Sequence, residues 1–289
     1  MGIQVLIAQS AVNGIVLGMT YVLVAIGFTL IFGIMRVVNF AHGEFYMLGA
    51  FVTFFAFSQY HVPFLFSLLI AAVVIGVFGM AVERVVFRPF RNNELNGMIA
   101  ALGLAIVIQN VALIAWGADP RSMPAVVTGI LKLGPLIFPW SRLYVILAAA
   151  VIIVLFFLII TYTSLGRAMR AVAQDTEIAL VQGIRAERIY PFAFGLSVAL
   201  AALAGGLMGS VFGVSPFIGL EPMLKAFIVV ILGGLGSVPG AVLGGLLLGV
   251  VESFASTFLG ATVSDFLLLG LVMLVLIVRP WGLMGVREG

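Results

Sequence analysis

Long apolar runs with few charged residues between them constrain this chain more than any other feature of its sequence. Nine such runs lie at about residues 10–34, 39–59, 63–83, 97–116, 143–163, 189–213, 223–235, 241–259 and 263–279. A transmembrane helix needs about 20 mostly apolar residues, and all but one of the runs come close to that length. The sequence therefore predicts an all-α polytopic membrane protein with about eight transmembrane helices. There are nine if the short run at 223–235 is a full span and not a re-entrant segment.

The composition agrees with this fold class. Hydrophobic residues make up 63% of the chain and charged residues only 9%, whereas about 25% of the residues in a soluble globular domain are charged. The net charge of +3 comes from arginines that lie between apolar runs and form no basic face. We therefore expect membrane lipid and no nucleic acid as a partner, and one transmembrane domain over residues 1–289.

The basic residues predict which loops face the cytoplasm. The loop at 84–96 carries three arginines and the loop at 164–188 carries four, whereas the loop at 117–142 has three basic residues beside four prolines. Loops rich in Lys and Arg tend to stay on the cytoplasmic side. We therefore expect the first two loops in the cytoplasm, and the third loop and the N-terminus outside.

The loop at 164–188 holds seven of the 25 charged residues of the chain. Asp175 predicts the start of a short helix at 176–182, because its carboxylate can accept the free N–H groups of the first turn. Glu177 would lie at the positive end of that helix, and Gly183 can take the left-handed conformation that ends one. A short capped helix facing water is typical of a docking element. We expect its apolar side chains to face inward; these are Ile178, Leu180 and Val181.

The chain lacks the motifs of nucleotide binding and of common hydrolases. A phosphate-binding loop needs Lys followed by Ser or Thr, but the two lysines precede Leu133 and Ala226. The histidines His42 and His61 make no His-Glu-x-x-His zinc site, and there is neither a cysteine nor a Gly-x-Ser-x-Gly elbow. We expect a protein that is not an enzyme and holds no cofactor or metal. If ATP drives it, another chain binds the ATP.

Polar residues within or beside apolar runs are candidates for a translocation path, because charge is costly inside a bilayer. The densest group is Asn39, His42 and Glu44, where the first run turns into the second, and Glu252 lies deeper, in the middle of 241–259. The first group could line the path as a polar kink or gate, or it could be an interfacial cap. Glu252 could contact substrate or bond to a neighbouring helix.

Glycines recur every four residues in the second half of the chain. They are Gly205, Gly209 and Gly213, and then Gly236, Gly240 and Gly244, followed by Gly245 and Gly249. Small residues at this spacing let helix backbones approach closely in lipid. Packing within the subunit is favoured over a dimer seam or a helix that slides during transport. No sequence repeat that would indicate two inverted halves is visible.

Three segments have a recognisable combined pattern: FGIMRVVNFAHGE at 32–44, LGGLGSVPGA at 232–241 and RPWGL at 279–283. They resemble the permeases of branched-chain amino acid ABC transporters, the LivH-type subunit, and the resemblance extends over nearly the whole chain. The segment 164–188 is similar to the loop by which ABC importer permeases engage their ATPases. Glu177, Ala179 and Gly183 are in register with that loop, whereas Ile178 stands where it has its first alanine, and the distance from Gly183 to Pro191 is shorter.

The resemblance implies a multi-pass subunit of an importer in a bacterial or archaeal inner membrane. The implied partners are a homologous second permease, two cytoplasmic ATPase subunits and a periplasmic or lipid-anchored substrate-binding protein. It also implies that the ATPases contact the helix shaped by Asp175, Glu177, Ala179 and Gly183.

The leading hypothesis is an ABC importer permease for leucine, isoleucine and valine or related amino acids. Urea and short amides are the nearest alternatives, since related permeases carry them. A secondary transporter coupled to protons or sodium is a different class, disfavoured by the predicted capped helix and by the scarcity of acids within the spans. The sequence leaves open the exact substrate and whether the permeases form a homodimer or a heterodimer.

Overall fold

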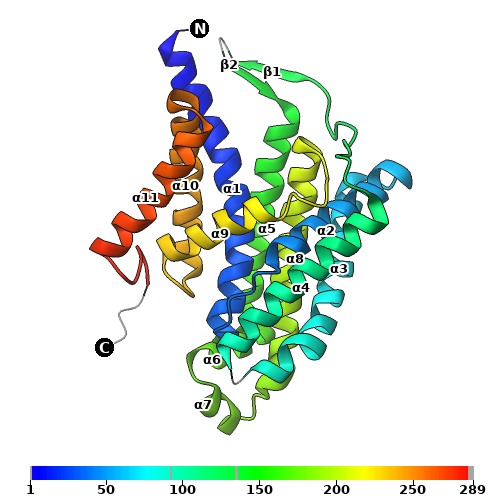
Figure 1. Cartoon of the computed structure of the whole chain (residues 1–289), viewed down its shortest axis with the longest axis vertical. Helices are drawn as coiled ribbons and strands as arrows, with labels where there is room; N and C mark the ends of the chain where they lie inside the picture. The colour runs from blue at the N-terminus through cyan, green and yellow to red at the C-terminus, as the bar shows by residue number, and fades with distance from the viewer. Residues whose placement is uncertain (1, 92, 134–135, 286–289) are drawn as a thin grey trace.

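The chain forms an elongated bundle of helices, most of which run roughly along the long axis of the molecule (Figure 1). The computed structural model describes residues 2–91, 93–133 and 136–285. The long helices are α1 (Ile3–Met35), α3 (Phe64–Val82), α4 (Glu94–Trp116), α5 (Trp140–Tyr162), α8 (Ala186–Phe212), α10 (Val238–Leu259) and α11 (Ala261–Val278). The short helices are α2 (His42–Phe54), α6 (Ser164–Gln174), α7 (Thr176–Val181) and α9 (Leu220–Gly233). Turns η1 (Phe55–Gln59), η2 (Glu83–Phe87) and η3 (Arg88–Phe90) continue α2 and α3.

Seven helical segments of the described chain are long and apolar enough to cross a bilayer. They are the seven long helices, with α3 extended through η2 and η3. The prediction of a helical polytopic membrane protein is confirmed at this level. The two other predicted runs, 39–59 and 223–235, correspond to α2 with η1 and to α9. At 13 and 14 residues, α2 and α9 are shorter than the about 20 residues that a span needs.

The order of elements is repeated in two parts of the chain. A long helix, a non-helical segment, a short helix and two further helices follow one another from α1 to α4 and again from α8 to α11. The short helices begin beside each other, since a Cβ added to Gly43 on α2 would collide with the backbone of Gly219, just before α9. From this point α2 and α9 run away in opposite directions (Figure 1). The two parts therefore share the order of their helices, although no repeat is visible in their amino-acid sequences.

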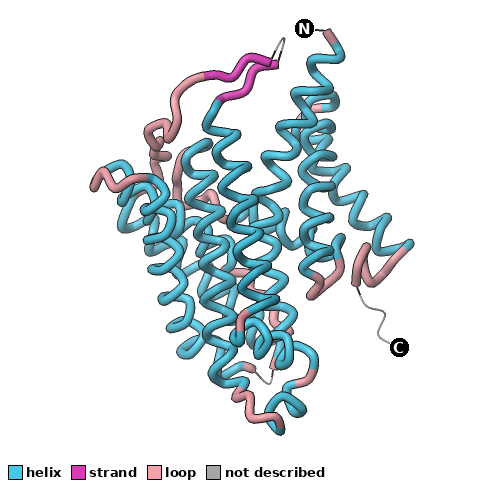
Figure 2. The backbone as a smooth tube through the Cα atoms, turned by 180° about the vertical axis from the view of Figure 1, so that it is seen from behind, coloured by secondary structure: helices cyan, strands magenta, loops and turns pink. Residues whose placement is uncertain are grey.

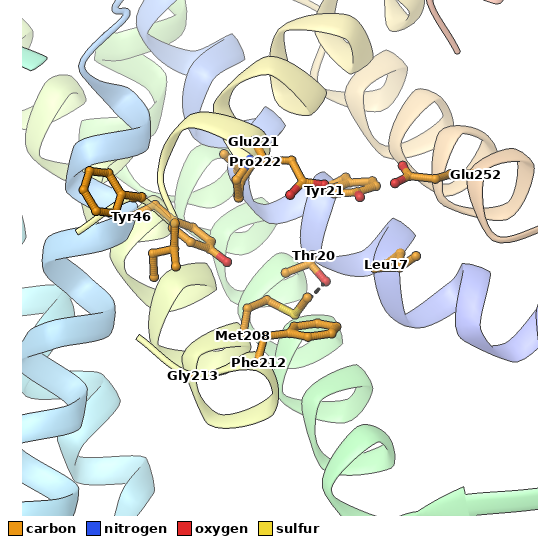
Figure 3. A pocket seen from close by; sticks show the side chains of 13 residues that line it. Leu17, Thr20, Tyr21, Tyr46, Met208, Phe212, Gly213, Glu221, Pro222 and Glu252 are labelled. Atoms are coloured by element: carbon orange, nitrogen blue, oxygen red, sulfur yellow. Dashed lines mark hydrogen bonds between the residues drawn. The ribbon is translucent and has the colours of Figure 1, made fainter. Parts of the chain in front are cut away.

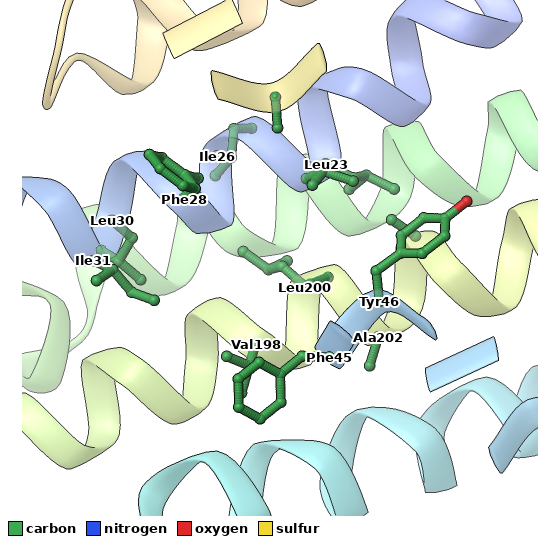
Figure 4. Close-up of a cluster of buried hydrophobic side chains, with 14 of the residues drawn as sticks. Leu23, Ile26, Phe28, Leu30, Ile31, Phe45, Tyr46, Val198, Leu200 and Ala202 are labelled. Atoms are coloured by element: carbon green, nitrogen blue, oxygen red, sulfur yellow. The ribbon is translucent and has the colours of Figure 1, made fainter. Parts of the chain in front are cut away.

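The interior is built around α1, against which α8, α9 and α10 pack. Every residue of α1 from 20 to 31 is buried. Figure 4 shows Leu23, Ile26 and Phe28 of this stretch in one cluster with side chains of α2 and α8. The outer helices α3, α4, α5 and α11 instead expose many aliphatic and aromatic side chains. An apolar outer surface of this extent is expected where a helix bundle meets lipid.

A small antiparallel hairpin lies in the loop predicted at 117–142, where sequence analysis expects no strand. Its strands are β1 (Ile130–Leu133) and β2 (Leu136–Pro139), and Pro139 leads directly into α5. Figure 2 shows the hairpin at the same end of the bundle as the N-terminus. Strands of four residues carry too weak a pattern to distinguish them from an irregular loop.

Glycines let α1 and α10 pack backbone against backbone. A Cβ on Gly14 would lie 2.7 Å from the Cα of Val250, and one on Gly18 would lie 3.0 Å from the Cα of Leu246. Gly249 faces the backbone of Gly18 and has no room for a side chain. The interpretation of the glycine spacing as packing within the subunit is confirmed for Gly249 and for other members of the two sets, among them Gly205, Gly240 and Gly244.

Gly249→Val should destabilise the protein, because the added side chain fits only if α1 and α10 separate. Overpacking costs about 1–3 kcal/mol, and more where only backbone lies opposite. We expect a smaller monodisperse peak in size-exclusion chromatography of a fluorescent fusion in detergent. Gly270→Val on α11 is the matched control, since a Cβ there meets nothing within 4 Å. An equal loss in both variants would contradict the packing argument.

Candidate functional site

The charged segment 164–188 folds into α6 and α7 at one end of the bundle (Figures 1 and 2). The carboxylate of Asp175 accepts hydrogen bonds from the backbone N–H groups of Glu177 and Ile178 at 2.8 and 2.9 Å. Asp175 is therefore the N-cap of α7, as its sequence position predicts. Glu177 is exposed in the first turn, where the helix dipole favours a negative charge.

Gly183 ends α7 in the left-handed conformation, with a φ of +83°. Its N–H donates to the carbonyl of Leu180, and the N–H of Ile184 donates to the carbonyl of Ala179, both at 2.9 Å. This pair of bonds is the Schellman arrangement, which usually has glycine after the C-cap. Because other residues are strained at this φ, Gly183 determines the turn from α7 towards α8.

The apolar side of α7 faces away from the protein, which corrects one prediction. The sequence predicts inward positions for Ile178, Leu180 and Val181, but these residues are 58%, 61% and 88% exposed. The inward residue is Ala179, which belongs to the buried core. A helix of six residues makes fewer than two turns, so a single side chain points at the bundle, and a methyl group allows the closest approach.

The turns between α3 and α4 lie against the same end. Arg88 pairs with Glu187 at 3.3 Å. Arg91 bonds to the buried Glu83, and its guanidinium lies 4.5 Å from the ring centre of Tyr190 on α8. The structure thus brings the two arginine-rich loops together, while the N-terminus and the hairpin lie at the opposite end (Figure 1). This arrangement is the one that the loop charges predict.

Asn39, His42 and Glu44 are buried where α2 begins. The side-chain oxygen of Asn39 accepts from the N–H of Ala41 at 3.1 Å. Nε2 of His42 lies 3.2 Å from the carbonyl oxygen of Val24, which ties α2 to α1. One carboxylate oxygen of Glu44 is buried and has no hydrogen-bond partner in the described chain. The three residues lie together in the interior.

A cavity of about 260 Å³ lies beside the start of α9 (Figure 3). Its walls come from α1, α2, α8, α9, α10 and the segment between α8 and α9. Asn39, His42 and Glu44 are not among its lining residues, whereas Glu252 is. The polar side chains that line it are Thr20, Tyr21, Tyr46, Glu221 and Glu252, and most of the rest of its wall is apolar.

A buried lysine holds Glu252. Oε1 of Glu252 accepts a hydrogen bond from Nζ of Lys225 at 3.0 Å, and the same Nζ donates to Oδ1 of Asp265 at 2.8 Å. The cluster connects α9, α10 and α11. Sequence analysis left open whether Glu252 contacts substrate or bonds to a neighbouring helix, and the structure shows the bond to a neighbouring helix. Its Oε2 is buried and has no hydrogen-bond partner in the described chain.

Sequence analysis missed four of the five polar residues of the cavity wall: Thr20, Tyr21, Tyr46 and Glu221. The tyrosines lie in apolar runs, where an aromatic residue is common, and Glu221 lies just before the run at 223–235, where nothing in the sequence distinguishes it from a glutamate at the membrane interface. Within the described residues, no group of three or more His, Cys, Asp or Glu side chains could hold a metal ion.

Comparison with known proteins identifies the family. The sequence model described as "Branched-chain amino acid transport system / permease component" matches residues 10–278. The high-affinity branched-chain amino acid transport system permease protein BraD of Pseudomonas aeruginosa is 37% identical, over 97% of this chain and 96% of its own. LivH of Escherichia coli strain K12, a permease protein of the same description, has the same identity and coverage. The probable permease protein LivH of Methanocaldococcus jannaschii is 27% identical, over 92% of this chain and 88% of its own. The chain therefore belongs to the family of branched-chain amino acid transport system permease components.

Proposed function

We propose that this chain is the transmembrane permease subunit of an ABC importer for branched-chain amino acids. The observation that carries the proposal is the similarity over nearly the whole length to permeases named for that transport, at 37–38% identity. The bundle of apolar helices supports a transport role. The chain is a multi-pass protein of the inner membrane and a transport subunit, and its sequence carries no nucleotide-binding loop.

The partners in this proposal supply the energy and the substrate. They are a homologous second permease, two cytoplasmic ATPase subunits and a periplasmic or lipid-anchored binding protein. The segment 164–188 is the coupling loop and α7 its coupling helix. Three exposed apolar side chains on so short a helix support a contact with another protein, because they gain free energy by leaving water. Asp175, Glu177, Ala179 and Gly183 act by shaping and orienting this helix.

The bilayer in this proposal is crossed nine times by a single domain over residues 1–289. Two crossings are composite: 36–41 with α2 and η1, and 213–219 with α9. Val214 pairs with Arg121 of the predicted external loop at 2.7 and 2.8 Å, whereas Gly236, after α9, lies beside Gly33 near the other end of α1. Non-helical backbone is tolerated at membrane depth where protein buries it, and only Arg36 and Phe217 of the two segments are exposed.

The translocation path in this proposal includes Asn39, His42, Glu44 and Glu252. Each of the four has a buried side-chain atom with no hydrogen-bond partner in the described chain. An unsatisfied buried polar group costs about 1–3 kcal/mol. Water or substrate that passes along a path would remove that cost, which supports a place on the path over a purely structural role.

Uptake by the reconstituted complex tests the function. Proteoliposomes with both permeases, the ATPases and the binding protein should accumulate radiolabelled leucine only when ATP is supplied to the ATPase side. Liposomes without the ATPases are the control and should take up none. Leucine uptake driven by an ion gradient in the control would establish a secondary transporter instead. Uptake of urea or acetamide in place of leucine would establish the amide alternative.

A further inference from the structure

The cavity beside α9 has a negatively charged wall. Glu221 and Glu252 line it, and no basic residue is among its lining residues in the described part of the chain. Lys225, behind the wall, already pairs with both Glu252 and Asp265. Of the two carboxylates that line the cavity, Glu252 is thus paired with a lysine, whereas Glu221 has no ion pair in the described chain. Charge within a membrane protein is costly unless it is paired, so a cationic group in the cavity would remove an imbalance that the protein leaves in place.

Two residues of the wall have hydrogen-bonding capacity that the protein does not use. Oε2 of Glu252 is buried and has no hydrogen-bond partner in the described chain, although the side chain of Tyr21 lies close to this carboxyl group. Tyr46 is only 5% exposed, yet its hydroxyl makes no hydrogen bond to the described residues and points into the cavity (Figure 3). The ring of Tyr21 lies between the carboxyl groups of Glu221 and Glu252 in the same view. Two residues with unsatisfied groups, one on α2 and one on α10, thus line one space, and such groups are typical of a ligand site.

We propose that this cavity binds an amino acid in transit by its α-ammonium group, with the carboxylates of Glu221 and Glu252 as acceptors. The proposal rests on the proposed function and adds the site within the membrane that recognises the substrate class. The hydroxyl of Tyr46 is a donor available to the carboxylate of the ligand. A charge-assisted hydrogen bond is stronger than a neutral one, so both glutamates favour an ammonium over a neutral amide.

The shape and lining of the cavity select the kind of cation. Leu17, Val24, Met208 and Phe212 give an apolar wall to a space of about 260 Å³. Sites for organic ligands combine such a wall with a few convergent polar groups. A bare sodium ion would gain nothing from the apolar wall, whereas a small aliphatic side chain would. The chemistry fits a zwitterion with a short aliphatic side chain.

Thermal stabilisation of the full-length chain in detergent tests the site, since a ligand that binds the folded state raises its melting temperature. Leucine should raise it, and so should 3-methylbutylamine, which keeps the ammonium group and lacks the carboxylate. The deaminated analogue 4-methylpentanoate should not. Glu221→Gln should weaken the apparent affinity for leucine about tenfold to a hundredfold, the equivalent of one hydrogen bond to a charged group.

Glu94→Gln is the matched control, because Glu94 is also an exposed glutamate in the first turn of a helix, α4, and lies outside the cavity. It should bind leucine as the wild type does. The site is overturned if Glu221→Gln binds leucine as well as the control does, if 4-methylpentanoate stabilises as strongly as the amine, if sodium chloride alone gives the full shift, or if leucine gives none. Leucine uptake that persists in Glu221→Gln would overturn the site and leave the transport function standing. Failure of uptake by the wild-type complex would overturn the function itself.

Discussion

Val181→Asp should abolish ATP-dependent leucine uptake while the protein remains folded in the membrane. Val181 is 88% exposed, so an aspartate there displaces no packed atom of this chain. In the proposed importer the same position lies against an ATPase subunit. Moving an isolated carboxylate from water into an apolar contact costs several kcal/mol. Each 1.4 kcal/mol of lost binding free energy raises the dissociation constant about tenfold, so the ATPases should bind this variant far more weakly. Co-purification of the ATPases and transport-linked ATP hydrolysis measure the loss.

Val127→Asp is the matched control, because Val127 is exposed on the predicted external loop and receives the same charge. It should leave ATPase association unchanged. Gly183→Pro tests the same helix through its backbone, since the φ of +83° at this position cannot be reached by proline, whose ring holds φ near about −65°. Full co-purification and activity in both Val181→Asp and Gly183→Pro would contradict docking at α7.

The sequence predicts well those features whose conformation depends on residues nearby in the chain. Asp175 caps α7 and Gly183 ends it, because both effects depend on backbone groups within a few residues. The spans follow from long apolar runs in the same way. The orientation of α7 was predicted wrongly, since the exposure of Ile178, Leu180 and Val181 depends on how a whole helix lies on the bundle.

The cavity and the repeated backbone path depend on contacts between distant residues. The backbone of Gly43 lies against that of Gly219, and Glu252 on α10 pairs with Lys225 on α9. Nothing in the sequence around any of these residues indicates its partner. Glu221 near a span end resembles many interfacial glutamates. Its place in a cavity wall follows only once α9 begins beside α2 in the interior of the bundle.

Lys225→Met should destabilise the protein strongly, because it removes the cation that α9 places between α10 and α11. The methionine fills a similar volume but leaves Glu252 as a buried carboxylate without its cation. Removal of one partner of a buried ion pair costs about 3–5 kcal/mol, because the remaining charge is desolvated and uncompensated. We expect a drop in melting temperature of roughly 10 °C, measured on the purified protein in detergent.

The double variant Lys225→Met with Glu252→Gln separates lost charge pairing from lost packing. If the uncompensated carboxylate causes the instability, removing its charge should restore more than half of the lost melting temperature, a coupling that a double-mutant cycle measures directly. Asp265→Asn is the control: the Asp265 side chain is 66% exposed, so its pair with Lys225 contributes less than about 1 kcal/mol. A double variant no more stable than Lys225→Met would show that the lysine acts through its aliphatic stem. Its charge would then have no part in holding α9, α10 and α11 together.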